Sequence, residues 1–286
     1  MNNRLQRIVK AQRVNMGDNW IDQPLPSPQA ERIGPFLLIH HWQDVLPGNQ
    51  SSLEVGVGPH PHRGFSPVTC IYSGALRHRD SLGTDHIVES GGTQWMDSGS
   101  GIVHSERPSD ALAESGGLLE MIQFWVNTPR HHKLDPPRYQ PLSRDDTPTW
   151  MEGDWQIELI QGVWGEHASP IQAHHPMRLA NLRAEKNGAT LEIPIPSDWV
   201  GLLYVLDGNA EVDGEPISGR HLAIIQPGDR ESVEITCGDA TRILMLTAAE
   251  LHEPVFSHGP FVMNTIEEVQ KAIFDYHDGK MGTLEE

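Results

Sequence analysis

Two short pairs of potential metal ligands lie in the first half of the sequence, His60-Pro61-His62 and His104-Ser105-Glu106. Side chains two residues apart on a β-strand point to the same face and lie about 6.6 Å apart along it. Each pair can therefore offer two ligating groups from one strand. If the two strands are neighbours, we expect four side chains to converge on a single divalent metal: His60, His62, His104 and Glu106.

The composition of this ligand set indicates its chemistry. Imidazole and carboxylate ligands suit Fe, Ni, Mn, Cu or Zn better than Ca or Mg, and the set lacks the thiolates that dominate structural zinc sites. Four protein ligands on a metal that accepts five or six leave room for a substrate, which is typical of a catalytic centre. Glu106 is the only obvious carboxylate of the set, so we expect it to offset the metal's charge and to carry any proton transfer.

The elements that position these residues are expected to be β-strands. Short apolar runs rich in β-branched residues lie close to turn residues, and the chain contains 22 Pro and 27 Gly. Candidate strands are Leu118–Val126, Gly201–Leu206, His221–Ile225 and Ile243–Leu246. The pattern predicts a mostly β chain whose strands form sandwiches or barrels.

The second half of the sequence can be laid over the first as an internal repeat. The alignment places Gly74 on Gly208 and Ser98-Gly99 on Pro227-Gly228. It replaces every candidate ligand by a residue whose side chain cannot bind a metal: His60 by Pro194, His62 by Pro196, His104 by Val233 and Glu106 by Ile235. The repeat predicts two copies of one β-barrel, with a single metal per chain in the first copy.

The domain boundary is expected in the Pro- and Asp-rich segment 136–154, whose composition disfavours regular structure. The predicted domains are residues 1–135, which hold the metal ligands, and residues 155–286. A short helix is expected near the end, because Thr265 can cap it, Glu268 occupies the capping-box position and Gly279 can stop it. Its apolar face is expected to pack on a barrel through Ile266, Val269, Ile273 and Tyr276.

Charge and composition exclude several classes of function. The formal net charge of -18 argues against binding to nucleic acid or to anionic lipid. The sequence has no apolar run of the roughly 18 residues needed to cross a bilayer, and its start lacks the apolar core of a signal peptide. The two cysteines, Cys70 and Cys237, lie far apart and suggest a reducing compartment. We therefore expect a cytoplasmic protein.

Several other residues have weaker patterns. Gln94 and Gln123 could orient ligating imidazoles through their second ring nitrogen, although strand amides are common. Four apolar residues are expected in the barrel core or at its mouth: Phe65, Trp95, Met96 and Trp125. The remaining histidines in polar, turn-like contexts are expected mostly at the surface: His78, His86, His131, His132, His174 and His175.

Longer motifs around these residues resemble a known family. HPHRGF at 60–65, HRDSLG at 78–83, QWMDSGSGIVHSE at 94–106 and EPVFSHGPFVMNT at 253–265 are similar to the pirins, a branch of the cupin superfamily. The resemblance runs from about residue 3 to about residue 282. It implies an all-β bicupin, with two tandem jelly-roll barrels, metal only in the first barrel, and a short C-terminal helix. Ser66 stands where many cupins have a ligating glutamate, and pirins take the carboxylate from the HSE motif instead.

The resemblance also implies a function. Pirins with these four residues are similar to quercetin 2,3-dioxygenases, so we expect a dioxygenase that binds one divalent transition metal, first of all Fe, with Ni, Mn, Cu or Zn also compatible. The substrates would be O2 and a flavonol-like, enolic or catecholic compound, and Glu106 would accept its hydroxyl proton. The alternative is an iron-dependent redox sensor that binds a transcriptional regulator or a metabolic enzyme without turnover. We expect a monomer that binds neither nucleic acid nor membranes.

Overall fold

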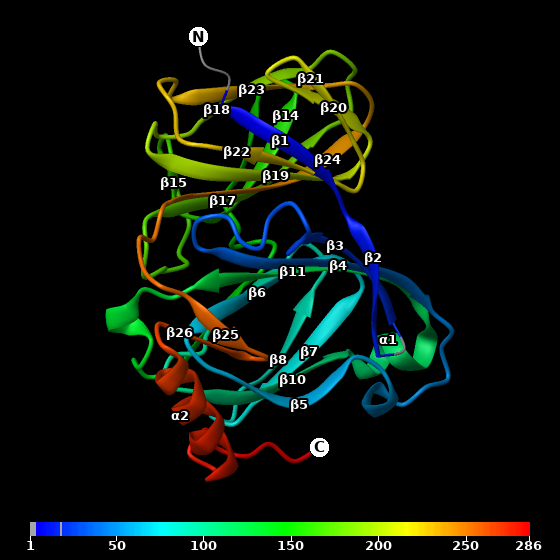
Figure 1. Ribbon diagram of the computed structural model, residues 1–286. Helices are drawn as coiled ribbons and strands as arrows, with labels where there is room; N and C mark the ends of the chain where they lie inside the picture. Colours follow the sequence, from blue (N-terminus) through cyan, green and yellow to red (C-terminus); the bar gives the residue numbers. More distant parts are fainter. Residues whose placement is uncertain (1–3, 18) are drawn as a thin grey trace. The chain divides into compact units, whose positions relative to one another are not determined.

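The structure is a computed structural model that describes residues 4–17 and 19–286 (Figure 1). The chain forms two compact units, and each contains two separate stretches of sequence. The first barrel, as we name it, contains His41–Arg144 and His252–Glu286. The second barrel contains Asp145–Leu251 and the described residues up to His40.

This division differs from two contiguous domains. The unit boundary at Arg144 lies within the expected linker 136–154, but that segment also contains paired strands. The N-terminal residues belong to the second barrel because β1 (Leu5–Lys10) pairs with β22 (His221–Ile225). Local composition does not show which strands pair across the sequence, and this pairing decides which unit a terminus joins.

The first barrel contains two sheets and short helical segments. One sheet contains, in order, β12 (Arg138–Leu142), β9 (Thr93–Asp97), β6 (Phe65–Ser73), β11 (Gly117–Asn127) and β4 (Phe36–Leu46). The other contains β5 (Val57–His62), β10 (Ile102–Pro108), β7 (Ala75–Asp80) and β8 (Asp85–Glu89). The helical segments are η1 (Ser52–Glu54), α1 (Asp110–Ser115) and η2 (Arg130–His132).

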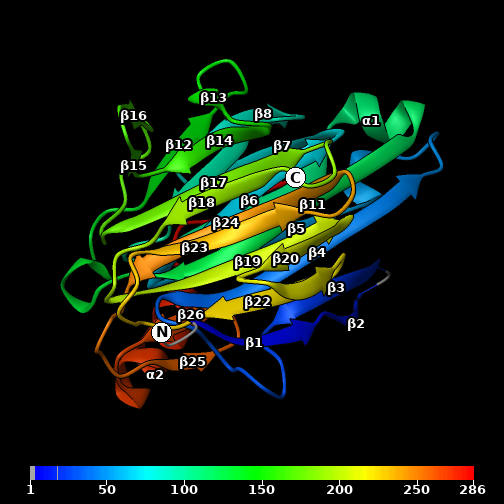
Figure 2. The same cartoon turned by 90° about the horizontal axis from the view of Figure 1, so that it is seen from above.

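The second barrel repeats this arrangement. One sheet has the order β1, β22, β19 (Trp199–Asp207), β24 (Thr241–Ala249), β17 (Met177–Ala184), β14 (Trp155–Gln161) and β13 (Thr149–Glu152). The other contains β18 (Thr190–Pro194), β23 (Ser232–Cys237), β20 (Asn209–Val212) and β21 (Glu215–Ser218). Figure 2 shows β22, β19, β24 and β17 side by side. The strand β2 (Gln12–Met16) pairs with β3 (Asn19–Leu25), and a separate two-stranded sheet contains β15 (Val163–Trp164) and β16 (His167–Ala168).

The strand orders confirm an internal repeat, since β5-β10-β7-β8 corresponds to β18-β23-β20-β21. The pairing registers correct the sequence alignment at two positions. His104 pairs with His60, and its counterpart Val233 pairs with Ile193. His60 and His62 therefore correspond to Ile193 and Ile195, one residue before the expected prolines. The second barrel has one extra residue between this strand and the turn at Gly208, and an alignment anchored on the turn cannot detect it.

The C-terminal segment of the first barrel forms β25 (Phe256–His258), β26 (Phe261–Met263) and α2 (Ile266–His277). The predicted helix is confirmed, with the capping box between Thr265 and Glu268 formed in both directions. The expected face is confirmed for Val269, which is buried, and for Ile273 and Tyr276, which pack against a buried cluster. Ile266 departs from the prediction, since it is 55% exposed, and Ala272 is buried in addition. No helix in residues 4–17 and 19–286 is both long and apolar enough to span a membrane.

Candidate metal centre

Three of the predicted ligands come together inside the first barrel. Antiparallel pairing of β5 with β10 sets His104 directly opposite His60, and His62 follows on the same face of β5. One ring nitrogen from each of the three histidines lies within 4.8 Å of the other two. The Nε2 atoms of His60 and His62 are 3.1 Å apart. This spacing suits three imidazoles that share one metal ion.

Burial keeps two of these imidazoles neutral. His62 and His104 are 2% and 1% exposed. Burial lowers the pKa of both well below 6.5, and the nearby His60 lowers it further. In the described part of the chain, the buried Nδ1 of His62 and Nε2 of His104 have no hydrogen-bond partner. Neutral imidazoles with unpartnered nitrogens in a buried site are the donors that a divalent transition metal requires.

Glu106 lies on the same face of β10 as His104, because β10 pairs in regular register with β7. Its carboxylate is not part of the cluster of mutually close ligand atoms formed by the three histidines. Instead it is 4% exposed and accepts hydrogen bonds from the side chains of three other residues: Gln94 at 2.5 Å, Gln123 at 2.6 Å and Thr69 at 3.1 Å. The role of Glu106 as a fourth ligand therefore stays a prediction.

Gln94 and Gln123 position Glu106, rather than a histidine as the sequence suggested. Each amide nitrogen donates to a different carboxylate oxygen of Glu106. The carbonyl oxygen of Gln123 accepts from the indole of Trp125 at 3.0 Å, which fixes the orientation of this amide. The sequence pattern located the two glutamines at the site but could not show which group they contact.

His78 contradicts the expectation of a surface residue. Its side chain is fully buried, its Nε2 lies 3.1 Å from Asp80, and its ring stacks on Tyr139 at 4.3 Å between centroids. Of the other histidines expected at the surface, His131 is exposed, whereas the rest are half-buried: His86, His132, His174 and His175. The spacing of His78 and Asp80, two residues apart in a strand, is the same signal that identified the ligand pairs.

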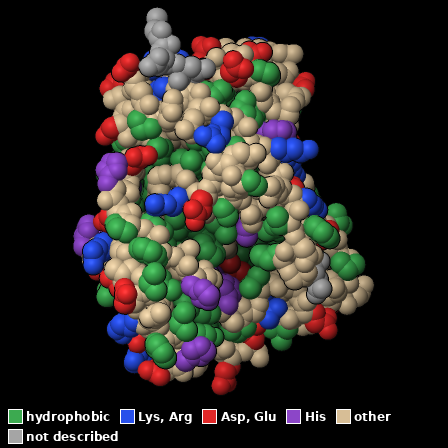
Figure 3. Space-filling model, viewed as in Figure 1, with side chains coloured by type: hydrophobic (Ala, Val, Ile, Leu, Met, Phe, Trp, Pro, Cys, Tyr) green, Lys and Arg blue, Asp and Glu red, His purple; other side chains and the backbone are tan. Residues whose placement is uncertain are grey.

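The site opens to solvent on one side. His60, Gln123 and Trp125 are half-buried, whereas the other members of the site are buried. Phe65 is buried and packs against Trp125 at 4.3 Å between ring centroids. Figure 3 shows a hollow over the strands of the first barrel, with hydrophobic side chains around it and acidic and histidine side chains visible within it. Two other residues expected at the mouth or core are core residues: Trp95 and Met96.

Arg63, the residue after His62, ties the ligand strand to the C-terminal segment. Its guanidinium donates to the carbonyl of Ser100 at 2.6 Å and to Asp275 of α2 at 2.8 Å. Its backbone N–H donates to the carbonyl of Pro260 at 3.2 Å. Hydrogen bonds from Lys271, Arg63 and Lys280 lower the pKa of Asp275, which therefore stays ionised.

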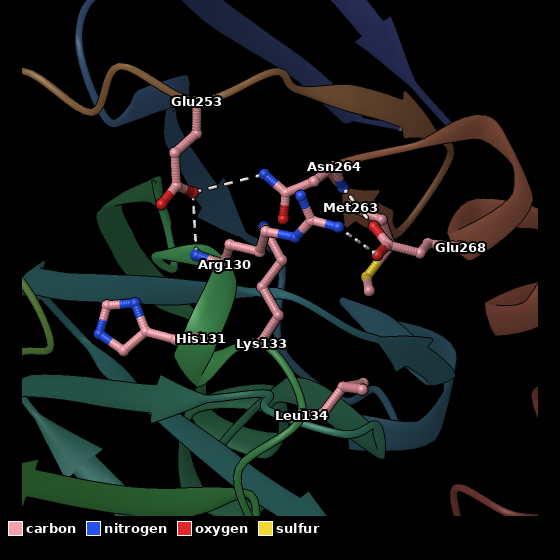
Figure 4. A pocket seen from close by; sticks show the side chains of 8 residues that line it. All are labelled: Arg130, His131, Lys133, Leu134, Glu253, Met263, Asn264 and Glu268. Carbon is pink, nitrogen blue, oxygen red and sulfur yellow. Dashed lines mark hydrogen bonds and ion pairs between the residues drawn. The ribbon is translucent and has the colours of Figure 1, made fainter.

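A second cavity of the first barrel, about 500 Å³ in volume, lies beside η2 and the C-terminal segment (Figure 4). It is lined by Arg130, His131, Lys133, Leu134, Glu253, Met263, Asn264 and Glu268. Most of its polar groups bond to protein groups, as when the backbone N–H of Arg130 donates to Glu253 at 2.9 Å. It lacks the convergence of unpartnered ligand atoms found in the histidine cluster, so we take the cluster as the functional site.

Lys133 lines this second cavity. It is 1% exposed, and its ammonium donates to three acceptors: Gly64 O at 2.6 Å, Asn127 Oδ1 at 2.7 Å and Val262 O at 2.9 Å. Burial lowers the pKa of Lys133 to about 7. The side chain thereby joins the turn after His62 to the C-terminal segment.

The second barrel contains no counterpart of the histidine cluster in its described residues. Ile193, Ile195, Val233 and Ile235 occupy the positions of the four predicted ligands. All of them belong to one buried hydrophobic cluster. The positions of Thr69, Gln94 and Gln123 are likewise apolar and belong to that cluster: Leu203, Ala223 and Met245.

Two barrels with the same strand order, one carrying a histidine cluster, define a bicupin. The chain belongs to the pirin family: the Pirin model matches residues 18–126, and the Pirin C-terminal cupin domain matches residues 180–282. A relative from Pseudomonas aeruginosa, which carries the name "Putative quercetin 2,3-dioxygenase", is 34% identical over 277 residues, 93% of this chain and 95% of that protein.

Solved structures agree with this assignment. A crystal structure described as quercetin 2,3-dioxygenase from Acinetobacter baumannii has a TM-score of 0.92 and 30% identity, and 99% of each chain is covered. The bacterial pirin YhhW from Escherichia coli, solved in complex with nickel(II), has a TM-score of 0.68 at 19% identity, covering 86% of this chain and 99% of that chain. The second likeness shows the fold alone.

Proposed function

We propose that this protein is a metal-dependent dioxygenase that acts with O2 on a flavonol-like or other enolic or catecholic substrate. The observation that carries the proposal is the cluster of His60, His62 and His104, in which two buried ring nitrogens have no hydrogen-bond partner among the described residues. Glu106 lies on the same face of β10 as His104, and two amides fix its carboxylate. The names of two relatives above support the reaction class.

The three histidines would hold the metal, with Glu106 as the proposed fourth ligand. We propose iron as the native ion, with nickel, manganese, copper or zinc as alternatives. When bound, the metal would supply a Lewis acid for the adjacent hydroxyl and keto oxygens of the substrate and a binding position for O2. For a flavonol, ring opening by O2 with release of carbon monoxide balances without an external reductant.

Glu106 would accept the proton of the substrate hydroxyl. Gln94 and Gln123 hold its carboxylate with amide N–H groups, which donate and cannot accept, so the arrangement complements the ionised form. Thr69 donates to Oε1 as well. A base held in this way needs no reorientation before it takes the proton, which lowers the entropic part of the barrier.

Trp125, with Phe65 packed against it, would bind the flat face of the substrate. Trp125 is half-buried beside His62, with 5.5 Å between ring centroids, and Phe65 lies behind it. Offset or edge-to-face contacts with an aromatic substrate are worth about 0.5–1.5 kcal/mol beyond the buried area. The same two rings exclude water from the side of the cluster that they cover.

The proposal is tested by removing metal from the purified protein and reloading it in turn with iron, nickel, manganese and copper. Flavonol consumption, followed by its absorption band, is measured with and without O2, and carbon monoxide is measured in the headspace. We expect O2-dependent consumption by at least one metal form. Full loading at one metal per chain with no consumption of any flavonol or catechol tested would reject the enzyme.

That negative result would instead favour the alternative, an iron-dependent redox sensor that binds a regulator or a metabolic enzyme. For such a protein, the measurable quantity is a reduction potential that shifts when the partner binds. The cytoplasmic location and the monomeric state are further proposals, which fractionation and sedimentation can test.

A further inference from the structure

Asp80 is anchored by the turn between β7 and β8. Its Oδ1 accepts the backbone N–H groups of Leu82 at 2.9 Å and Thr84 at 3.0 Å. Its Oδ2 lies 3.1 Å from Nε2 of His78, and both side chains are fully buried. A carboxylate fixed by two backbone donors can only accept from His78, so Nε2 of His78 carries the ring proton.

This proton fixes the state of the next ring. In the neutral ring of His78, donation from Nε2 leaves a lone pair on Nδ1. This atom lies 3.5 Å from Nδ1 of His104. His104 must then carry its own proton on Nδ1. Its Nε2 is left with a lone pair, and this is the buried atom that has no protein partner. A histidine that ligates a metal needs this arrangement, with the second nitrogen bonded to a partner that fixes the tautomer.

A second series of side-chain contacts leads from His86 and Tyr139 through Gln94 to Glu106. The Tyr139 hydroxyl lies 3.2 Å from Oε1 of Gln94, and Nδ1 of His86 lies 3.2 Å from the same hydroxyl. Burial raises the pKa of Tyr139, and Glu106 and Asp80 raise it further, so the hydroxyl stays a donor. A donor at Oε1 forces the amide nitrogen of Gln94 toward Glu106, where it donates at 2.5 Å.

The two series of side-chain contacts meet where the His78 ring stacks on Tyr139, with an interplanar angle of 16°. The second barrel shows what happens to these positions when the ligands are absent. There, the pairing register puts Val212 at the position of His78, and the strand ends at that residue, before the position of Asp80. Val212 belongs to the hydrophobic core of that barrel. The polar pair is therefore present only in the barrel that carries the histidine cluster.

We propose that Asp80, His78 and Tyr139 are positioning residues of the site: Asp80 and His78 fix the tautomer of His104, and Tyr139 fixes the orientation of Gln94 and so of Glu106. The inference rests on the proposed metal binding by the three histidines, and its tests are read without turnover.

The Asp80→Asn variant gives the sharpest test. The backbone N–H groups of Leu82 and Thr84 hold the amide oxygen, so the new NH2 group faces His78 and donates to its Nε2. The proton of His78 must move to Nδ1, and that of His104 must move to Nε2, which blocks the metal-binding atom. We expect an inverted His104 tautomer in the ¹⁵N spectrum of the metal-free protein and metal affinity lowered about 10–100-fold.

The matched control is Asp85→Asn, the same change at an exposed position of β8 that bonds to Arg77. It should leave the tautomer and the metal affinity unchanged. An unchanged His104 tautomer in Asp80→Asn, together with metal affinity within threefold of the wild type, would overturn the proposal whether or not the protein turns over a flavonol.

Two further variants keep the proposal testable if Asp80→Asn fails to fold. His78→Phe keeps an aromatic ring against Tyr139 but removes both nitrogens, and should lower metal affinity about 10–100-fold. Tyr139→Phe keeps the stack and removes the hydroxyl, and should leave metal affinity within threefold while the Gln94 amide loses its fixed orientation in the NMR spectrum. Equal loss of affinity in both variants would indicate a packing role only and reject the assignment.

Discussion

The two barrels share one strand order but have opposite interiors. In the first barrel, the strand faces around the cluster carry three histidines, a glutamate and the amides that hold it. In the second, every corresponding position is apolar and belongs to one buried cluster. The comparison teaches that the strand framework does not depend on a metal. The polar set behaves as a unit, since none of its members remains where the ligands are absent.

One feature is common to both barrels and is therefore independent of the metal. In each, a buried cation from a distant segment holds the connection that follows the position of His62. Lys133 donates to Gly64 O in the first barrel, whereas Arg4 in the second donates to the carbonyl of Ile195 at 2.6 Å and to that of the following Pro196 at 3.1 Å. Both cations are 1% exposed. A buried charge is tolerated here because each one is surrounded by oxygen acceptors.

The largest expected effect is that of His104→Ala. The variant should lose the metal and all metal-dependent turnover while its fold is kept, because the apolar core supplies most of the stability. Elemental analysis and near-ultraviolet circular dichroism measure the two outcomes. His62→Ala should behave in the same way, and the wild type should bind one metal per chain. A ratio near two, or unfolding of the metal-free wild type at room temperature, would contradict this contrast between the barrels.

The reciprocal change, Ile193→Ala, is made at the position that corresponds to His60. Ile193 is fully buried in the apolar cluster, so truncation leaves a cavity and should lower the free energy of unfolding by about 2–5 kcal/mol. Metal content and turnover of the folded variant should not change. Chemical denaturation and elemental analysis check this. Loss of metal from the variant would contradict this expectation, because it would show that metal binding in the first barrel depends on packing in the second.

Glu106→Gln separates the carboxylate from the histidines. The variant should retain metal through the imidazoles but lose turnover by about 10²-fold or more, because an amide cannot accept the substrate proton. Its NH2 group would also face the donating amide of Gln94 or Gln123. Flavonol binding, seen as a shift in its absorption band, should survive. Turnover within tenfold of the wild type would remove Glu106 from the role of base.

The smallest expected effect is a pH dependence of the metal-free protein. The folded-state pKa values of His62 and His104 lie below 6.5, so only the unfolded chain gains these protons as the pH falls below that value. Stability is therefore complete above about pH 6.5 and falls below it, by up to about 1.4 kcal/mol per pH unit for each histidine. Denaturation curves at pH 7.5 and 5.5 measure the slope. A His62→Gln, His104→Gln double variant should have a shallower slope, and equal slopes would disprove this account.

Much of the site could be predicted because β-strands have a period of two. That period puts the side chains of His60 and His62 on the same face of their strand, and those of His104 and Glu106 on the same face of theirs. Pairing of the two strands then brings the three histidines together. The all-β fold and the capped C-terminal helix followed from turn residues and capping positions in the same local way. These are properties that a few adjacent residues determine.

The remainder depended on pairing between distant segments. His78 looked like a surface residue because its neighbours in the sequence are charged, yet the strand face on which it lies turns inward. Gln94 and Gln123 were placed at the site, but hydrogen-bond geometry decided that they hold Glu106. The assignment of the N-terminal strand and the C-terminal helix to different barrels likewise could not be predicted from local composition.

The tie between Arg63 and the C-terminal helix has a consequence for biosynthesis. Arg63 and Asp275 are 212 residues apart, so Arg63 has left the ribosome long before its partner exists. At about 5–20 residues per second, the interval is roughly 10–40 s. During that time the strand that carries His60 and His62 lacks the contact between Arg63 and Asp275 at its end. The end of the strand that carries two of the candidate ligands is therefore fixed only when almost the whole chain has been synthesised.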